Sequence, residues 1–279
     1  MEIRSTSETL AHLYKLSLNE GNFRFRGQAD KTWPIKPSIY RYSRFFRYQT
    51  TIYEKHLLRA KPPKANPPLT HTDYDLEWLM ICQHYEVPTR LVDWSTDILS
   101  ALFFACYGEK ETDGALYICK QSDYPLFHKY DESLANSQEL AFVSTNVINP
   151  RMRNQSGCFM MWGHSPMDNT TETYDLSQYH KQNESSYFLD KLTIPANAKQ
   201  KILNELESIY SISYDSIYLK NGFLETKYSS EFKALKENSR LMTLYMTDAD
   251  QLGETEALKA RSMFRIECRN MYGNCINLR

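Results

Sequence analysis

The stretch that decides the fold class is LEWLMICQHYEVPTRLVDWSTDILSALFFACYGEKETDGALYIC, residues 76–119. Its first part, residues 76–86, is apolar enough for a buried helix, which ends before Pro88 because proline has no amide hydrogen to donate. Residues 98–107 predict a second buried helix, and a strand at 115–119 follows an Asp-Gly turn. Long apolar helices and short strands in this order predict an α+β protein.

Outside this stretch the pattern is weaker but of the same kind. The sequence predicts further strands at 142–143, 158–162 and 263–267, helices at 198–206 and 230–238, and loops at 62–68 and 168–186. No linker precedes residue 211, so we expect residues 211–279 to be a C-terminal extension that packs on the rest of the chain.

The composition is that of an ordinary globular protein. Of 279 residues, 42% are hydrophobic and 24% are charged, with a formal net charge of −1, which excludes wholesale disorder. Residues 1–5 lack the basic start and apolar run of a signal peptide, so none is expected. The longest nearly apolar run, residues 98–107, is about half of what a membrane-spanning helix needs. We therefore expect a cytoplasmic protein without a membrane partner, whose oligomeric state the sequence leaves open.

Several common chemistries have no motif here. The six cysteines are scattered without a CxxC pair, and the histidines lack metal-ligand spacing, so reduced thiols are expected and a metal is not. With only 9 glycines the chain also lacks the P-loop, Rossmann and nucleophile-elbow patterns.

Positive charge is concentrated in one block. Residues 24–64 hold eleven Lys and Arg against two acidic residues, a local balance of +9. Cations and exposed rings together bind phosphates and bases, so the block predicts contact with RNA or DNA. The alternative, equally weighted, is a solvated helix face with its rings in the core. The rings are Phe25, Trp33, Tyr40, Tyr42, Phe45, Phe46, Tyr48 and Tyr53.

Five blocks of sequence, in order, resemble a known family. The blocks are FRGQ (25–28) with PSIYR (37–41), QHYEVPTRLVDWS (83–95), ALFFA (101–105), DGAL (113–116) and RMRNQSGCF (151–159). This set resembles the FRG domain, a bacterial and phage-associated family, over residues 1–210 with core motifs at 23–160. The family implies a setting in phage defence or a toxin system. One departure is Glu86, where the family usually has glycine.

The same blocks are more distantly similar to the ADP-ribosyltransferase core. That resemblance implies a split mixed or antiparallel sheet with flanking helices, with NAD as the substrate and no metal. It implies that Arg26 holds the nicotinamide ribose or phosphate, that Gly27 meets the carboxamide and that Ser95 bonds the ribose. The match fails at Gly157, which stands where a catalytic glutamate is expected. Asp93 is the leading substitute, with Glu139 a distant second.

The candidate site residues fall into three groups. The catalytic candidates are Arg26, Asp93 and Gln155; the NAD-binding candidates are Arg26, Gly27, Gln28, Tyr85, Arg90, Trp94 and Ser95; the substrate-binding candidates are Trp33, Arg41 and His84.

Some of these residues have structural explanations that stay open. Arg26 is suited to a buried ion pair, and His84 to capping the helix that ends beside it. Arg90 and Asp93 are suited to an ion pair shielded by Trp94, and Gln155 to a turn in which its amide bonds the backbone.

Two functions of different classes remain. The first is an effector that binds NAD and transfers ADP-ribose to a macromolecule, with nucleic acid favoured by the basic block, or that hydrolyses NAD. The alternative is a non-catalytic module that binds RNA, a nucleotide or a protein through the same basic aromatic surface. A carboxylate in the cleft distinguishes the two, because only the enzyme needs one, and Asp93 is the candidate.

Overall fold

The structure is a computed structural model of the 279-residue chain. It describes residues 1–18, 21–41, 47–61, 74–137, 139–143, 150–163, 175–176, 188–218, 229–245 and 253–272. The loop predicted at 62–68 lies outside the described residues, as does the one predicted at 168–186 except for residues 175–176.

A seven-stranded sheet forms the centre of the molecule, with strand order β4-β5-β6-β2-β1-β3-β7. Neighbouring strands are antiparallel except β4 and β5, which are parallel, so the sheet is mixed and the α+β class is confirmed. The predicted strands at 115–119, 142–143 and 158–162 are β3, β5 and β6. The strands are β1 (Phe23–Gln28), β2 (Leu91–Ser95), β3 (Gly114–Lys120), β4 (Leu126–Phe127), β5 (Ala141–Val143), β6 (Gly157–Met161) and β7 (Leu189–Ile194).

Helices surround the sheet, and those predicted at 76–86, 98–107, 198–206 and 230–238 are α3, α4, α8 and α11. The helices are α1 (Thr6–Ser17), α2 (Arg47–Arg59), α3 (Tyr74–His84), α4 (Ile98–Cys106), α5 (Glu132–Asn136), α6 (Pro150–Asn154), α8 (Ala196–Tyr210), α9 (Tyr214–Ile217), α11 (Ser229–Tyr245) and α12 (Glu254–Tyr272), with short 3-10 helices at Ser38–Tyr40 and Gln121–Asp123.

The strand predicted at 263–267 is wrong, because this segment lies inside α12. Among the side chains of α12 that the structure describes, the buried ones are Ala257, Ala260 and Phe264, which recur at helical spacing rather than in alternation. They form one face, and α12 packs against α11 and α2. Residues 263–267 resemble a short strand by themselves. The helical spacing of the buried face becomes visible only when Ala257 and Ala260 are included.

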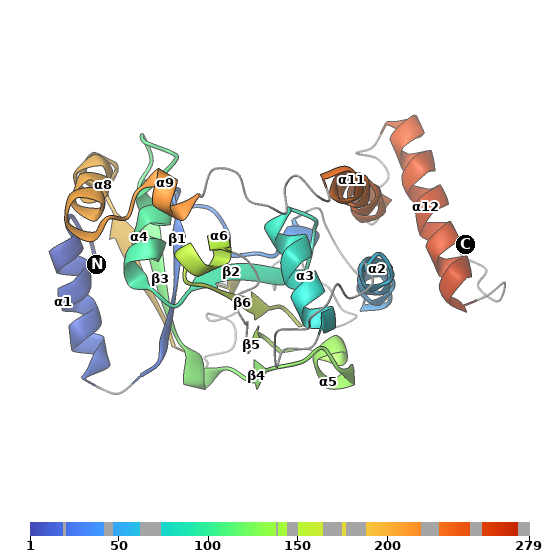
Figure 1. The fold of residues 1–279 in the computed structure, drawn as a ribbon, viewed down its shortest axis with the longest axis horizontal. Coiled ribbons are helices and arrows are strands. Elements are labelled where there is room, and N and C mark those ends of the chain that lie inside the picture. Colours follow the sequence, from blue (N-terminus) through green and yellow to red (C-terminus); the bar gives the residue numbers. More distant parts are fainter. Residues whose placement is uncertain are drawn as a thin grey trace.

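The sheet separates two hydrophobic cores, as β3 shows. Leu116 and Ile118 belong to the core that contains α4 and α8, whereas Ala115, Tyr117 and Cys119 belong to the core that contains α2 and α3. This alternation is what a strand covered on both faces requires. In Figure 1, α1, α4 and α8 gather on one side of the molecule, with α2, α3, α11 and α12 on the other.

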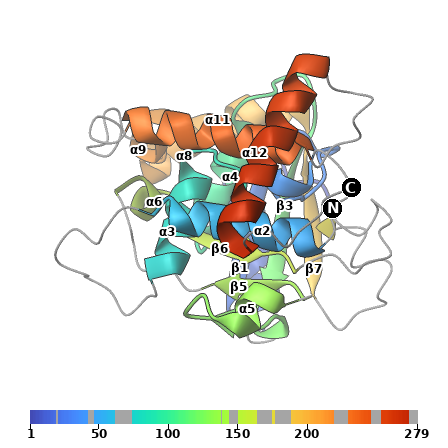
Figure 2. The same cartoon turned by 90° about the vertical axis from the view of Figure 1, so that its right-hand side faces the viewer.

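The C-terminal helices α11 and α12 contribute to the core that contains α2 and α3. Leu235 and Met242 of α11 and Phe264 of α12 are buried in the same cluster as residues of β2 and β6. Figure 2, which looks onto this side, shows α12 running across α2. Within the described residues, no helix combines the length and apolarity needed to cross a membrane.

Helix α4 lies unusually close to the sheet, and two glycines make this possible. A Cβ added at Gly27 of β1 would lie 1.9 Å from the carbonyl oxygen of Ala101, and one at Gly114 of β3 would lie 2.1 Å from that of Ala105. Asp97 caps the helix by accepting hydrogen bonds from the amides of Leu99 and Ser100. These contacts fix α4 against β1 and β3.

Candidate functional site

The sheet opens between β1 and β2. The two strands pair at a single position, Phe25 with Ser95, whereas β1 pairs with β3 at six. Beyond this point a cavity of about 590 Å³ lies between them. The cavity is lined by residues from both faces of β1, because the opening exposes both. Phe25 and Gly27 lie on one face and Arg26 on the other. The cavity wall also includes Arg41, Gln83, His84, Asp93, Trp94, Ser95, Gln155, Gly157, Tyr218 and Lys236.

Arg26 presents its guanidinium group to this cavity. One Nη donates to the backbone oxygen of Asp93, while Nε is buried and has no hydrogen-bond partner among the described residues. Burial lowers the pKa of Arg26, Arg41 acts in the same direction, and the Asp93 carboxylate opposes both. In the described part of the chain no carboxylate forms an ion pair with Arg26, so the geometry does not support the structural ion pair considered above.

The carboxylate of Asp93 is held by a short chain of hydrogen bonds. Thr89 Oγ1 accepts from the amide of Leu91 at 3.0 Å and donates to Gln83 Oε1 at 2.6 Å. This orients the Gln83 amide so that Nε2 donates to Asp93 Oδ2 at 2.9 Å. Asp93 Oδ1 has no hydrogen-bond partner within the described ranges. Gln83 therefore positions the Asp93 carboxylate. It is not among the site residues predicted from the sequence, although a polar residue near the end of a buried helix could have indicated such a role.

Ser95 ties β2 to the turn before β6. Its hydroxyl donates to the backbone oxygen of Gln155 at 2.9 Å and accepts from the amide of Asp97 at 3.0 Å. Ser95 is buried and its hydroxyl is already engaged in both roles, so the structure shows a bracing function for it. The Gln155 side-chain amide donates to the carbonyl of Ile217 at 3.5 Å, a long contact with the backbone.

Gly157 faces Ser95 across the ladder between β2 and β6 and also lines the cavity. The nearest atom to an added Cβ there is the carbonyl oxygen of Met152, at 3.3 Å, so this position has nearly enough room for a side chain. Gly27 differs, since α4 occupies the space where its side chain would be. Close packing of α4 therefore accounts for Gly27 without any ligand.

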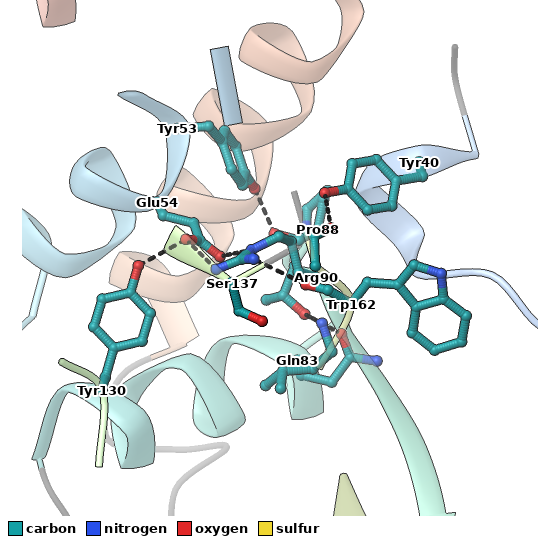
Figure 3. Close-up of polar contacts among 12 residues, drawn as sticks. Tyr40, Tyr53, Glu54, Gln83, Pro88, Arg90, Tyr130, Ser137 and Trp162 are labelled. Atoms are coloured by element: carbon teal, nitrogen blue, oxygen red, sulfur yellow. Dashed lines mark hydrogen bonds and ion pairs between the residues drawn. The ribbon is translucent and has the colours of Figure 1, made fainter. Parts of the chain in front are cut away.

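Arg90 lies in the core and does not line the cavity. It is fully buried, and its Nε and Nη2 donate to the two carboxylate oxygens of Glu54 at 2.6 and 2.9 Å. Figure 3 shows the fork-to-fork pair, with Nη1 donating to the carbonyl of Trp162 at 2.8 Å and the Tyr130 hydroxyl donating to Glu54 at 2.7 Å. The ion pair predicted between Arg90 and Asp93 is wrong, because the partner is Glu54.

The other predicted site residues divide between the cavity and its surroundings. Arg41, His84 and Trp94 line it; the Trp94 indole is buried, packs edge-on to Phe142 at 5.9 Å, and has an Nε1 without a partner among the described residues. Three others, Gln28, Tyr85 and Trp33, do not line the cavity. Gln28 donates to the carbonyl of Pro34, and Tyr85 packs edge-on against His84. Trp33 is 46% exposed.

Two cavity residues come from the far end of the sequence. Tyr218 follows α9, and Lys236 of α11 forms an ion pair with Glu86, which also lines the cavity. No motif in the sequence marks either residue, because only the packing of the C-terminal helices brings them here.

The rings of the basic block that the structure describes do not form a single stacking surface. Phe25, Tyr40 and Tyr53 are buried in the cores, as the alternative explanation required. Lys31 and Lys61 form ion pairs with Asp113 and Asp75. Trp33 is exposed, while Tyr42, Phe45, Phe46 and the side chain of Tyr48 lie outside the described residues.

Metal ligation and thiol chemistry have little support in the described residues. No group of three or more His, Cys, Asp or Glu side chains there is arranged to hold a metal ion. Cys82, Cys106, Cys119 and Cys158 are free and buried. Burial raises the pKa of the cavity residue Cys158 to about 12, so its thiol stays protonated near neutral pH.

Comparison with known proteins gives one match. The family model of the FRG domain matches residues 21–114, the segment that carries Arg26, Gln83 and Asp93. Neither a curated protein nor a solved structure matches the chain. The first three of the five ordered blocks lie within this segment, the fourth ends just beyond it and the fifth, at 151–159, lies outside it, so the resemblance to the FRG domain is shown for residues 21–114.

Proposed function

We propose that the protein binds NAD in the cavity between β1 and β2 and cleaves its bond to nicotinamide. As the bond to nicotinamide breaks, the ADP-ribosyl group forms a new bond to a nucleophile of the acceptor, which loses a proton. When water is the acceptor, the product is free ADP-ribose. The observation that carries the proposal is the pairing of two groups in one cavity: the Arg26 guanidinium, which has no ion-pair partner among the described residues, and the oriented Asp93 carboxylate.

The Arg26 guanidinium suits an anionic ligand. Its buried Nε lacks a partner among the described residues, and a buried donor without a partner costs about 1–3 kcal/mol unless a ligand satisfies it. A diphosphate supplies acceptor oxygens that a planar guanidinium binds strongly. Arg41 lies in the same wall and adds positive charge. Arg26 and Arg41 together are the proposed diphosphate or ribose-binding residues.

Asp93 is the proposed substitute for the missing glutamate. Cleavage of a glycosidic bond develops positive charge on the ribose, which a nearby carboxylate stabilises. Asp93 lies two residues along β2 from the Ser95–Gly157 pair, about 7 Å by strand geometry. Its carboxylate is therefore close to the position where the catalytic glutamate is expected. Gln83 restrains Oδ2, which leaves Oδ1 for the ribose.

The cavity has a suitable size and shape for a dinucleotide. Its volume of about 590 Å³ lies within the range of 300–1,000 Å³ typical of small-molecule sites. Trp94, Phe104 and Tyr218 give it apolar walls against which a planar ring packs. For the acceptor we propose a nucleic acid, on the charge of the block at 24–64 alone.

The binding step is tested by isothermal titration of the full chain with NAD. The account predicts saturable binding that weakens at least tenfold in Arg26→Met. The matched control is Arg24→Met, which changes the same residue type on the same face of β1 outside the cavity wall and leaves affinity within twofold. Circular dichroism checks that both variants fold. Equal affinity in all three proteins, or no binding to the wild type, would sink the proposal.

A further inference from the structure

A second cavity, of about 650 Å³, lies on the other side of α4. Its walls are the end of α4, one side of α8 and the short helix α9, which lie side by side in Figure 1. It shares no lining residue with the cavity between β1 and β2. Whatever it binds is therefore held by different side chains from those of the proposed NAD site.

Stacked aromatic rings form one wall of this second cavity. Tyr107 stacks on Phe103 with centroids 5.1 Å apart and planes at 13°. Tyr214 stacks at 4.8 Å and 30° on Tyr218, which supports this wall from behind and lines only the other cavity. Tyr107 and Tyr214 lie 5.4 Å apart, and each remains more than 40% exposed. Exposed tyrosine rings held rigidly by other rings stack well on a planar ligand, with about 1–3 kcal/mol per nucleobase.

A buried lysine forms the floor. Lys199 of α8 is only 3% exposed, and its ammonium group donates to the carbonyl oxygens of Ala29 and Glu109. No carboxylate in the described part of the chain lies within ion-pair distance of it, although buried charges are ordinarily paired. Burial of the ammonium group lowers the pKa of Lys199. An ammonium group has three donors, so one remains for an anionic oxygen in the cavity.

The remaining polar groups are spaced along α8. Lys199 and Glu207 both line the cavity and are eight residues apart, about 12 Å along the helix. This span accommodates a nucleoside monophosphate, with its phosphate at the Lys199 end and its nucleoside at the Glu207 end. The Glu207 carboxylate suits ribose hydroxyls, which carboxylates bind in dinucleotide sites, and Lys110 places a second cation in the wall.

We propose that this cavity binds a nucleoside monophosphate, with the base stacked on Tyr107 and Tyr214, the ribose at Glu207 and the phosphate at Lys199 and Lys110. The site is separate from the proposed NAD site, and its occupancy does not depend on whether NAD is bound or cleaved elsewhere.

The test is isothermal titration of the full chain with three probes: AMP, adenosine and inorganic phosphate. AMP is expected to bind saturably and at least tenfold more tightly than adenosine, because only AMP meets the lysines. Tyr214→Ala should weaken AMP at least tenfold, while Tyr214→Phe, which keeps the ring, should stay within twofold. Lys199 also braces two backbone carbonyls, so Lys110→Gln provides a second variant on the phosphate side, with an expected loss of at least threefold.

The Arg26→Met variant distinguishes binding in this second cavity from binding in the proposed NAD site. AMP affinity that is unchanged in Arg26→Met and lost in Tyr214→Ala supports the second site even if NAD is never bound. The proposal is overturned if AMP fails to bind at millimolar concentration, if adenosine binds as tightly as AMP, or if Arg26→Met abolishes binding that Tyr214→Ala leaves intact.

Discussion

At the residue scale, Glu86 has an unfavourable backbone. Its φ of 60° lies in the left-handed region that favours glycine, and a residue with a Cβ pays about 1–2 kcal/mol there. The resemblance to the FRG domain already marked this position as one where glycine is usual, and the backbone angle supplies the reason. The ion pair between Glu86 and Lys236 is exposed and offsets little of this cost.

We predict that Glu86→Gly stabilises the protein by about 0.5–1 kcal/mol, since relief of the left-handed strain exceeds the entropy cost of glycine. In a chain of this size that raises Tm by about 2 °C, measurable by thermal unfolding. Glu86→Ala is the control, because it removes the same ion pair and keeps the Cβ. A Tm that rises equally in both variants would assign the gain to the carboxylate instead.

The buried pair of Arg90 and Glu54 gives a second prediction at this scale. Arg90→Met leaves the Glu54 carboxylate in the core with Tyr130 as its one remaining donor among the described residues, and breaking a buried pair in this way costs about 3–5 kcal/mol. Urea unfolding measures the loss. Arg90→Lys keeps the charge but not the two-pronged contact, and should lie between the wild type and Arg90→Met. A loss below about 1 kcal/mol in Arg90→Met would contradict the structural role.

At the element scale, the seating of α4 on β1 depends on Gly27. We predict that Gly27→Ala destabilises the protein by about 3 kcal/mol or more, because its Cβ would lie 1.9 Å from a backbone oxygen of α4 and the helix must move. The matched control is Gly157→Ala in the same cavity, where the nearest atom is at 3.3 Å and a loss below about 1 kcal/mol is expected. Denaturant midpoints that fall equally for both would show that α4 is not the constraint.

Asp113 links three elements and makes their packing sensitive to pH. Its carboxylate accepts from Lys31 Nζ and from the amide of Ala196, both at 2.9 Å. The bond from Lys31, then that from the Ala196 amide, lowers the pKa of Asp113 below its usual value near 4. A lowered folded-state pKa gives stability that is present above the unfolded pKa and lost as the pH falls through the folded one.

We therefore predict that unfolding midpoints of the wild type fall between about pH 4 and pH 2 more steeply than those of Asp113→Asn, which has no such proton to bind. Thermal unfolding at a series of pH values gives both slopes. Identical slopes would show that the contact of Asp113 with Lys31 and Ala196 does not contribute.

At the scale of the whole molecule, the sequence predicted the parts that local pattern determines. The helices α3, α4, α8 and α11 and the strands β3, β5 and β6 each carry their own periodicity or apolar run. The last strand was wrong because Met263 to Glu267 was taken alone, whereas α12 derives its buried face from residues spaced three and four apart.

The candidate site was predictable where motifs supply it and not where packing does. Arg26, Asp93 and Gln155 do share one cavity wall, as does the substrate candidate Arg41. Arg90 lies elsewhere, because its partner Glu54 is 36 residues earlier and only the packing of α2 brings it near. Lys236 reaches the cavity through the docking of α11, which no local motif encodes.

The central claim is that Asp93 and Arg26 act together on NAD. The most direct measurement is nicotinamide release from NAD by the purified full chain, with total RNA, DNA and protein supplied as acceptors. The account predicts release that falls at least a hundredfold in Asp93→Asn and persists in Glu139→Gln, which removes an exposed carboxylate outside the cavity wall. Folded wild-type protein that binds NAD without releasing nicotinamide, or release that is equal in Asp93→Asn, would contradict it.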